Sequence, residues 1–346
     1  MKLSEHSAFP VDARRPFIGA SSGSQLHVVT LAPSRRHTQH FALDEQGRVI
    51  GPVTSLPLAR AESLGASADS VIVVGQVQND GHRTVIRLHA GEIVWQDTVR
   101  IDRRLLVAPQ LAVAGERALL VWAIEHEKSA LCVAAIEADS IEETLQFEFD
   151  DFIFDLRALA TEHALTVTCI HGTNTTSLEL ITIAEKAITQ RVTIEDATRP
   201  VAPSLALAGN ELVVFWITKP EHELRAQHFD ETLQPLGPAA LIASANGAEM
   251  RNARVFQGRD DRLALSYSTA RQSDEWSVIP EQNEPDRYET AFTHEQFLGS
   301  YDYKARLAGE FQKLEGSSIS YAASGWANDS LLLLSELEAP AISIYQ

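Results

Sequence analysis

Arginine recurs at a similar position ahead of a repeated apolar segment in this sequence. The five arginines that share this position are Arg15, Arg60, Arg104, Arg199 and Arg251. Each precedes the first residue of an apolar run by 11 to 14 residues. A guanidinium group binds carboxylate, phosphate or sulfate through paired hydrogen bonds, so these arginines predict an anion-binding site. The alternative is that each arginine pairs with an acidic side chain or a carbonyl of the next structural unit.

The fourth unit has acidic residues where five of the other units have arginine. Asp150, Asp151 and Asp155 stand there, followed by Arg157. Carboxyl groups beside an arginine can act as general acid and base, so Asp151 and Asp155 are the candidate catalytic residues if the protein is an enzyme. The segment 19–23 also matches Gly-x-Ser-x-Gly, but we expect a strand and a tight turn there, whereas a nucleophile elbow needs a strand, a turn and a helix.

The longest connection expected in the chain covers residues 270–287 and carries Trp276 among prolines and acidic residues. An aromatic residue on a long loop is typical of a lid or of a partner-binding element, and this makes Trp276 a candidate binding residue. The alternative is that this stretch is a tolerated surface insertion and that the aromatic residues after it fill space between units.

Metal-ligating residue types show no regular pattern. The histidines that fall in the expected connections are His37, His82, His126, His171 and His222. They come from separate units at irregular offsets, and no Cys-x-x-Cys occurs. We therefore expect no metal site and no cofactor, and we expect Cys132 and Cys169 to be buried thiols.

The elements that must position these side chains are short strands in a repeat. Residues 109–115 and 203–209 are near copies, and each is followed by an apolar run that ends in tryptophan. The repeated runs begin at Leu26, Val71, Ala118, Ala164, Leu212, Leu263 and Leu331. Their spacing is 45 to 51 residues, apart from a last step of 68. Short segments rich in Val, Ile, Leu and Thr, broken by Gly, Pro, Asn or Asp, predict four strands per unit.

This pattern resembles the seven-bladed β-propeller architecture with the degenerate repeats seen in bacterial propellers. The resemblance covers the whole chain and implies an all-β fold of four-stranded antiparallel blades. No functional family is recognised, because the WD, kelch, Asp-box, YWTD and NHL signatures are absent. We expect one propeller domain over 1–346, with blades near 14–59, 60–103, 104–150, 151–198, 199–244 and 245–310, and a last blade made of 311–346 plus 1–10.

The strands of the fifth blade are expected near 203–208, 211–217, 223–229 and 235–243. The second strand should be buried on both faces, while the third should alternate and partly face water. The seventh blade ends with a strand at Ala341–Tyr345 and lacks a fourth strand. We expect residues 2–9 to supply it, which closes the ring and removes an exposed sheet edge.

The charge balance restricts the partners. The 346 residues include 29 Lys plus Arg and 47 Asp plus Glu, giving a net charge of −18. This argues against nucleic-acid binding and against an anionic membrane surface, since both need a basic footprint. The first seven residues lack the apolar segment of a signal peptide, so we expect a bacterial-type cytoplasmic location.

Two functions remain open from the sequence. The first is a non-catalytic binding or scaffold propeller that holds a protein partner or a small anionic ligand. The second is an enzyme, a hydrolase, lyase or isomerase, that acts on an anionic or glycan-like substrate at the channel mouth. We expect either site on the face that carries the connections between second and third strands and those between blades, here named the top face.

Overall fold

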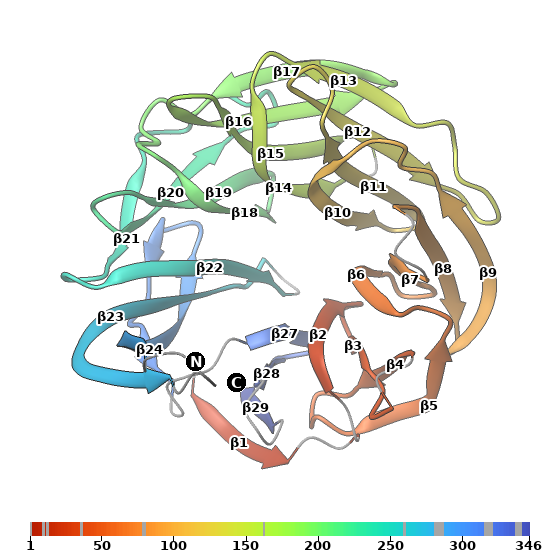
Figure 1. The fold of residues 1–346 in the computed structure, drawn as a ribbon, viewed down its shortest axis with the longest axis horizontal. Helices are drawn as coiled ribbons and strands as arrows, with labels where there is room; N and C mark the ends of the chain where they lie inside the picture. Colours follow the sequence, from red (N-terminus) through yellow and green to blue (C-terminus); the bar gives the residue numbers. More distant parts are fainter. Residues whose placement is uncertain are drawn as a thin grey trace.

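The computed structural model describes residues 2–8, 11, 14–34, 37–77, 81–161, 163–258, 261–279, 287–314, 321–335 and 341–346. Seven antiparallel sheets form a ring around a central opening (Figure 1). The fold is therefore the expected seven-bladed β-propeller. Over the described ranges, no helix is long and apolar enough to cross a membrane.

Each blade contains four strands in meander order, numbered outward from the centre, and blade six adds a fifth short strand. Blade one contains β2 (Arg14–Ser21), β3 (Leu26–Leu31), β4 (Thr38–Leu43) and β5 (Val49–Leu56). Blade two contains β6 (Arg60–Ala66), β7 (Val71–Gln76), β8 (Arg83–His89) and β9 (Glu92–Val99). Blade three contains β10 (Leu105–Ala114), β11 (Arg117–Ile124), β12 (Ser129–Ile136) and β13 (Leu145–Phe149). Blade four contains β14 (Phe152–Ala160), β15 (Leu165–Gly172), β16 (Thr176–Ala184) and β17 (Ala187–Thr193).

The last three blades complete the ring. Blade five contains β18 (Val201–Ala208), β19 (Glu211–Thr218), β20 (Glu223–Phe229) and β21 (Ala240–Ser244). Blade six contains β22 (Glu249–Gln257), β23 (Leu263–Ile279), β24 (Arg287–Asp302), β25 (Leu307–Ala308) and β26 (Gln312–Lys313). Blade seven contains β27 (Tyr321–Ala327), β28 (Ser330–Ser335), β29 (Ala341–Tyr345) and the N-terminal strand β1 (Leu3–Ala8).

The N-terminal strand closes blade seven, as the sequence predicts. β1 runs antiparallel to β29, with Leu3 opposite Tyr345. Two reciprocal backbone hydrogen bonds between Lys2 and Gln346, at 3.0 and 3.1 Å, extend this ladder. Because the two ends of the chain share one sheet, the ring is held shut by a full row of backbone hydrogen bonds.

Burial follows strand order within a blade. The second strands are buried on both faces, as β3 and β7 show. The third strands are also largely buried, and every residue of β4 is buried. The expected alternation in the third strand of blade five is limited to Glu223 and Arg225, which are half-buried, while its other residues are buried. The alternation with water falls instead on the fourth strands, such as β17, since only this outermost strand lies beyond the neighbouring blades.

All seven innermost strands carry a register shift against the second strand of their blade. The shifts lie at Arg14/Phe17, Ala61/Ser63, Leu105/Val107, Ile153/Asp155, Val201/Ser204, Arg251/Arg254 and Tyr321/Ala323, with a second in blade three at Val107/Gln110. A β-bulge turns side chains out of the regular alternation and tightens the local twist. The top end of every inner strand is therefore irregular, next to the positions of the predicted arginines.

Two expected segments differ from the structure. Residues 270–279, expected to lie in a loop, belong to β23, and Ile279 pairs with Arg287 of β24. Residues 280–286, between the two strands, lie outside the described ranges. In blade five the fourth strand begins at Ala240, five residues later than expected. Pro235 and Pro238 explain the delay, because proline has no N–H to donate to a ladder.

Candidate functional site

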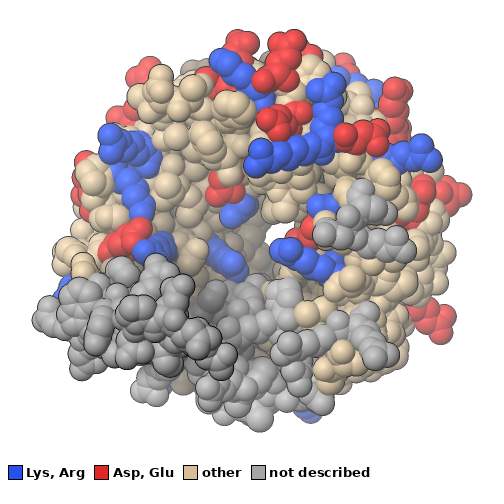
Figure 2. Space-filling model, in the orientation of Figure 1, with Lys and Arg blue, Asp and Glu red and all other residues tan. Residues whose placement is uncertain are grey.

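A large top-face pocket lies between blades four and five. It has a volume of about 820 Å³. Blade four contributes the inner strand β14 and the connection from β15 to β16, and blade five contributes the segment that leads into β18. The ring is open at its centre, and Lys and Arg side chains border this opening in the face shown (Figure 2). The pocket thus combines the two kinds of connection that define the top face.

The wall of this pocket is largely apolar. Phe154, Ile170, Pro200 and Val201 contribute hydrocarbon surface. The Phe154 side chain is 54% exposed, which is unusual for phenylalanine on an inner strand. Sequence reasoning missed this residue, although its place between Ile153 and Asp155 at the bulge is what turns it outward. An exposed aromatic ring beside apolar side chains offers a surface for an apolar ligand group.

Arg199 lies on the rim of the pocket. Its side chain is exposed, and in the described part of the structure it makes no hydrogen bond or ion pair. Its backbone has φ of 42°, and Ala202 has φ of 51°, both in the left-handed region that side chains rarely adopt. Such a conformation costs about 1 to 2 kcal/mol per residue. The segment that carries Arg199 is therefore held in a strained shape where the chain enters blade five.

Asp155, a second predicted residue, lines the same pocket. Its carboxylate accepts hydrogen bonds from Arg157 at 2.8 Å and from the backbone N–H of Leu156 at 2.9 Å. Burial raises the pKa of Asp155, and the Arg157 guanidinium opposes that shift. The structure thus brings Asp155 and Arg199 to one cavity, although they come from different blades.

Asp151 points elsewhere. Its carboxylate accepts a hydrogen bond from the Thr173 hydroxyl at 2.6 Å and lies 4.0 Å from the Lys128 ammonium of blade three. The Thr173 hydrogen bond lowers the pKa of Asp151. No described hydrogen bond or ion pair joins Asp151 to Asp155, and Asp151 does not line the pocket. The two carboxyl groups therefore do not form a pair at this site.

Two of the remaining predicted arginines, Arg60 and Arg104, differ in whether an acidic side chain lies near them. Arg60 begins β6 with an exposed side chain that makes no hydrogen bond or ion pair to any described residue. Arg104 is 78% exposed and lies 3.8 Å from Glu125, a distance at which a surface ion pair contributes little. Neither lines the pocket between blades four and five.

Arg251 belongs to an ion-pair network that reaches the pocket. Glu249 binds both Arg251 and the Lys219 ammonium of blade five. The Arg251 hydrogen bond, followed by that of Lys219, lowers the pKa of Glu249 to about 2. Lys219 lines the pocket, and its backbone N–H donates to the Thr198 carbonyl at 3.3 Å. The network therefore joins blades five and six and leaves the Lys219 charge neutralised at the pocket wall.

Two candidate residues cannot be placed by their side chains. Arg15 lies in β2 and Trp276 lies in β23, where Trp276 pairs with Thr290. Both side chains lie outside the described part of the structure. Over the described ranges, no three His, Cys, Asp or Glu side chains come together as a metal site requires.

Comparisons with known proteins give a fold but no family. No family model and no curated protein matches the chain. Among solved structures, the β-propeller domain of the Trilobed protease from Pyrococcus furiosus, described as having an open velcro topology, is 7% identical with a TM-score of 0.60, covering 97% of this chain and 96% of that one. The WD40 β-propeller domain of Doa1 is 9% identical with a TM-score of 0.56, covering 99% and 96%. BBS1N, solved in complex with ARL6DN, is 9% identical with a TM-score of 0.56, covering 99% and 95%.

Likeness at 7 to 9% identity carries the fold alone. These similar structures include a propeller from a protease, a WD40 domain and a domain solved in complex with another protein, so the fold they share does not select a function. The chain is a seven-bladed β-propeller, and its function must be argued from its own surface.

Proposed function

We propose that this protein is a non-catalytic binding propeller, and that the pocket between blades four and five holds a carboxylate-bearing group of a protein partner or small ligand. The observation that carries the proposal is the unpaired Arg199 guanidinium at the rim of an apolar pocket. An apolar wall suits the body of a ligand, while one uncompensated cation selects an anionic end.

The charge around Arg199 supports an anion. Lys219 is already neutralised by Glu249, and Asp155 by Arg157, so Arg199 remains the uncompensated charge among the described lining residues. The net charge of −18 opposes anion binding at long range, so recognition depends on short-range contacts within the pocket.

The enzyme alternative has weaker support. Glycan hydrolysis usually depends on two carboxyl groups that flank the scissile bond on opposite sides. Asp155 lines the pocket and its pKa is raised, but Asp151 is bound to Thr173 away from it. One carboxyl group that is already paired with Arg157 does not supply both roles.

The test uses 4-phenylbutyrate as the probe and 4-phenylbutanol as its uncharged counterpart, with binding measured by NMR titration. We expect the acid to bind more tightly than the alcohol. Arg199→Gln should weaken the acid about tenfold, the effect of losing one charge-assisted hydrogen bond, and should leave the alcohol unchanged.

Arg48→Gln is the matched control, because Arg48 is an exposed arginine of the hairpin between β4 and β5, on the other face. Equal affinity for acid and alcohol, or equal weakening by the two substitutions, would show that Arg199 does not recognise an anion.

A further inference from the structure

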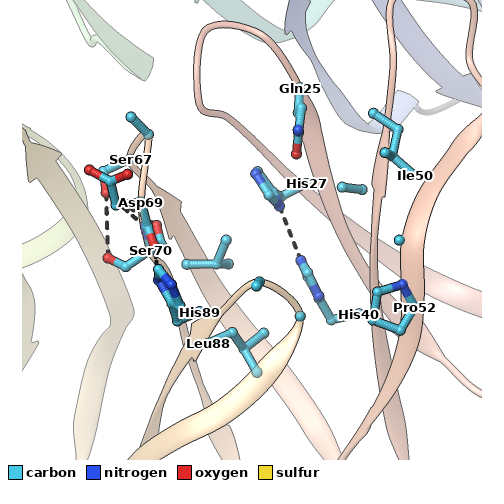
Figure 3. Close-up of a pocket in the computed structure, with 16 residues that line it drawn as sticks. Gln25, His27, His40, Ile50, Pro52, Ser67, Asp69, Ser70, Leu88 and His89 are labelled. Atoms are coloured by element: carbon cyan, nitrogen blue, oxygen red, sulfur yellow. Dashed lines mark hydrogen bonds between the residues drawn. The ribbon is translucent and has the colours of Figure 1, made fainter.

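A second pocket opens on the opposite face of the ring, between blades one and two. This bottom face carries the turns between first and second strands and between third and fourth strands. The pocket has a volume of about 310 Å³. His27 and His40 of blade one form one side, and the turn Ser67–Ser70 with His89 of blade two faces them across the cavity (Figure 3).

We assign the hydrogens of the two histidines from the hydrogen bonds that link them. The Gln25 carbonyl can only accept, and the Ser22 hydroxyl donates its one hydrogen to it at 3.4 Å. The Ser22 oxygen therefore accepts from His27 Nε2–H, 3.3 Å away. His27 Nδ1 then carries a lone pair and accepts from His40 Nε2–H at 3.2 Å.

The chain ends at His40 Nδ1, which is left with a lone pair. This atom has no hydrogen-bond partner among the described residues, although His40 is only 3% exposed. A buried acceptor without a partner costs about 1 to 3 kcal/mol. His40 lines the pocket and its Nδ1 lone pair lies just beneath the pocket surface, so a ligand N–H group would reach this acceptor after a shift of the side chains that cover it.

His27 and His40 bring no positive charge into the pocket at neutral pH. Burial lowers the pKa of His27 to about 4. Burial, together with His27, lowers the pKa of His40 to about 3. Across the cavity, His89 Nδ1–H donates to the Asp69 carbonyl at 2.8 Å, so His89 Nε2 is a further acceptor when the ring is neutral. The Asp69 carboxylate is exposed and has no ion pair in the described structure.

The acidic surface continues into a neighbouring cavity of about 550 Å³ between blades two and three. The two cavities share the turn Ser67–Ser70 and His89. Glu116 and Glu137 line the second cavity, and neither carboxylate is ion-paired within the described ranges. Its one cation, Arg87, donates to the Glu137 carbonyl at 2.6 Å.

Aliphatic side chains flank both cavities on the outer strands. Ile50 of β5 is 39% exposed and Val94 of β9 is 56% exposed. Apolar residues beside carboxylates are typical of a surface that binds a segment with alternating basic and apolar side chains.

We propose that this bottom-face groove binds a basic segment of a partner protein, and that a lysine side chain of that segment enters the pocket between His40 and Asp69. An ammonium group has three donors and no acceptor, so it matches a pocket whose side-chain groups offer lone pairs and a carboxylate. An anionic ligand would meet Asp69 and the His40 lone pair, and an uncharged ligand would leave the carboxylates uncompensated. The inference concerns the other face and the opposite charge, so it stands apart from the proposed anion site.

The experiment measures the fluorescence anisotropy of a labelled peptide, acetyl-Gly-Leu-Lys-Gly-Lys-Gly-amide, with the full chain. A peptide with norleucine in place of both lysines and an acidic peptide with glutamate there are the comparison probes. We expect measurable binding of the lysine peptide alone, weakening as NaCl rises from about 50 to 300 mM because exposed charges are screened.

Asp69→Asn should weaken the lysine peptide about fivefold, since it removes one charge without changing shape. Asp97→Asn is the matched control, because Asp97 is an exposed carboxylate of β9 that lines neither cavity. His40→Phe should weaken binding as well, and circular dichroism must first show that this variant keeps its sheet content. If the His40 variant loses sheet content, the comparison of Asp69→Asn with Asp97→Asn tests the proposal by itself.

Absence of binding, equal binding of the norleucine or acidic peptide, or equal affinities of the Asp69 and Asp97 variants would each overturn the proposal. The Arg199→Gln variant should bind the lysine peptide normally, so the result does not depend on the top-face pocket.

Discussion

Two buried histidines of this ring differ in how their nitrogen atoms are satisfied. His228 Nδ1–H donates to Glu211 at 2.7 Å, and its Nε2 accepts from the Tyr301 hydroxyl of blade six at 2.7 Å. Burial lowers the pKa of His228 and raises that of Tyr301 to about 12, so both stay neutral and the bond across the blades persists. His40, by contrast, keeps one unsatisfied nitrogen. The first histidine joins two blades, whereas the second has one nitrogen without a hydrogen-bond partner among the described residues.

The lowered pKa values of His27 and His40 predict acid sensitivity. In the unfolded chain both histidines bind a proton near their ordinary pKa of 6.5. In the folded protein His27 binds one only near pH 4 and His40 only near pH 3. The stability of the folded protein is therefore unaffected by these groups above pH 6.5 and decreases as the pH falls from 6.5 towards 3. Between these limits the free energy of unfolding should fall by about 1 kcal/mol per pH unit for each histidine.

Urea denaturation at pH 7.5, 6.0 and 5.0 measures this slope. The His40→Asn variant should show a shallower slope than the natural chain, because one titrating group is removed. Gln96→Asn, at an exposed side chain that does not titrate, is the control and should keep the natural slope. Identical slopes for all three proteins would contradict the assignment.

At the scale of the elements, the sequence predicts strands better than their irregularities. The apolar runs at Leu212–Trp216 and its copies place the second strands correctly, because burial on both faces leaves a continuous hydrophobic signal. The bulges of the inner strands were not predicted, since they depend on how neighbouring blades meet. They decide that Phe154 faces outward and that Asp155, but not Asp151, reaches the pocket. Arg199 was a candidate by spacing, but its lack of a partner required the structure.

Gly75 of β7 is required by the bulge in β6. A Cβ at this position would lie 2.2 Å from the Arg60 carbonyl oxygen and 2.9 Å from Ala61 Cα. Both contacts are with backbone, so the strand pair must separate to admit a methyl group. We expect Gly75→Ala to lower the free energy of unfolding by about 2 to 4 kcal/mol, beyond the usual overpacking cost.

Chemical denaturation compares this variant with Gly115→Ala. Gly115 has φ of 58° and open space where its Cβ would lie, so only backbone strain of about 1 kcal/mol applies there. A Gly75 variant no less stable than the Gly115 variant would mean that β6 shifts without cost.

At the scale of the whole molecule, one pairing keeps the ring closed. Every residue of β29 is buried, and β1 covers its outer edge over five paired positions. Each other blade is formed by a contiguous stretch of chain, so its strands pair without the ends of the chain meeting. Blade seven instead needs a contact across more than three hundred residues, which is slow to form but ties the first blade to the last.

Removing residues 1–8 should therefore open the ring. The exposed edge of β29 would present unpaired N–H and C=O groups beside buried leucines of β28, so we expect a lower thermal midpoint and self-association through this edge. Differential scanning calorimetry measures the midpoint, and sedimentation velocity measures the association.

A synthetic peptide of residues 2–9 added in excess should restore the thermal midpoint and the monomeric state, because it binds only the folded ring. The same peptide with proline at Glu5 and Ser7 lacks ladder donors and should not rescue. The truncated chain could instead have the same thermal midpoint as the full-length protein and stay monomeric. That result would show that the other six blades and the remaining three strands of blade seven keep the ring closed without β1.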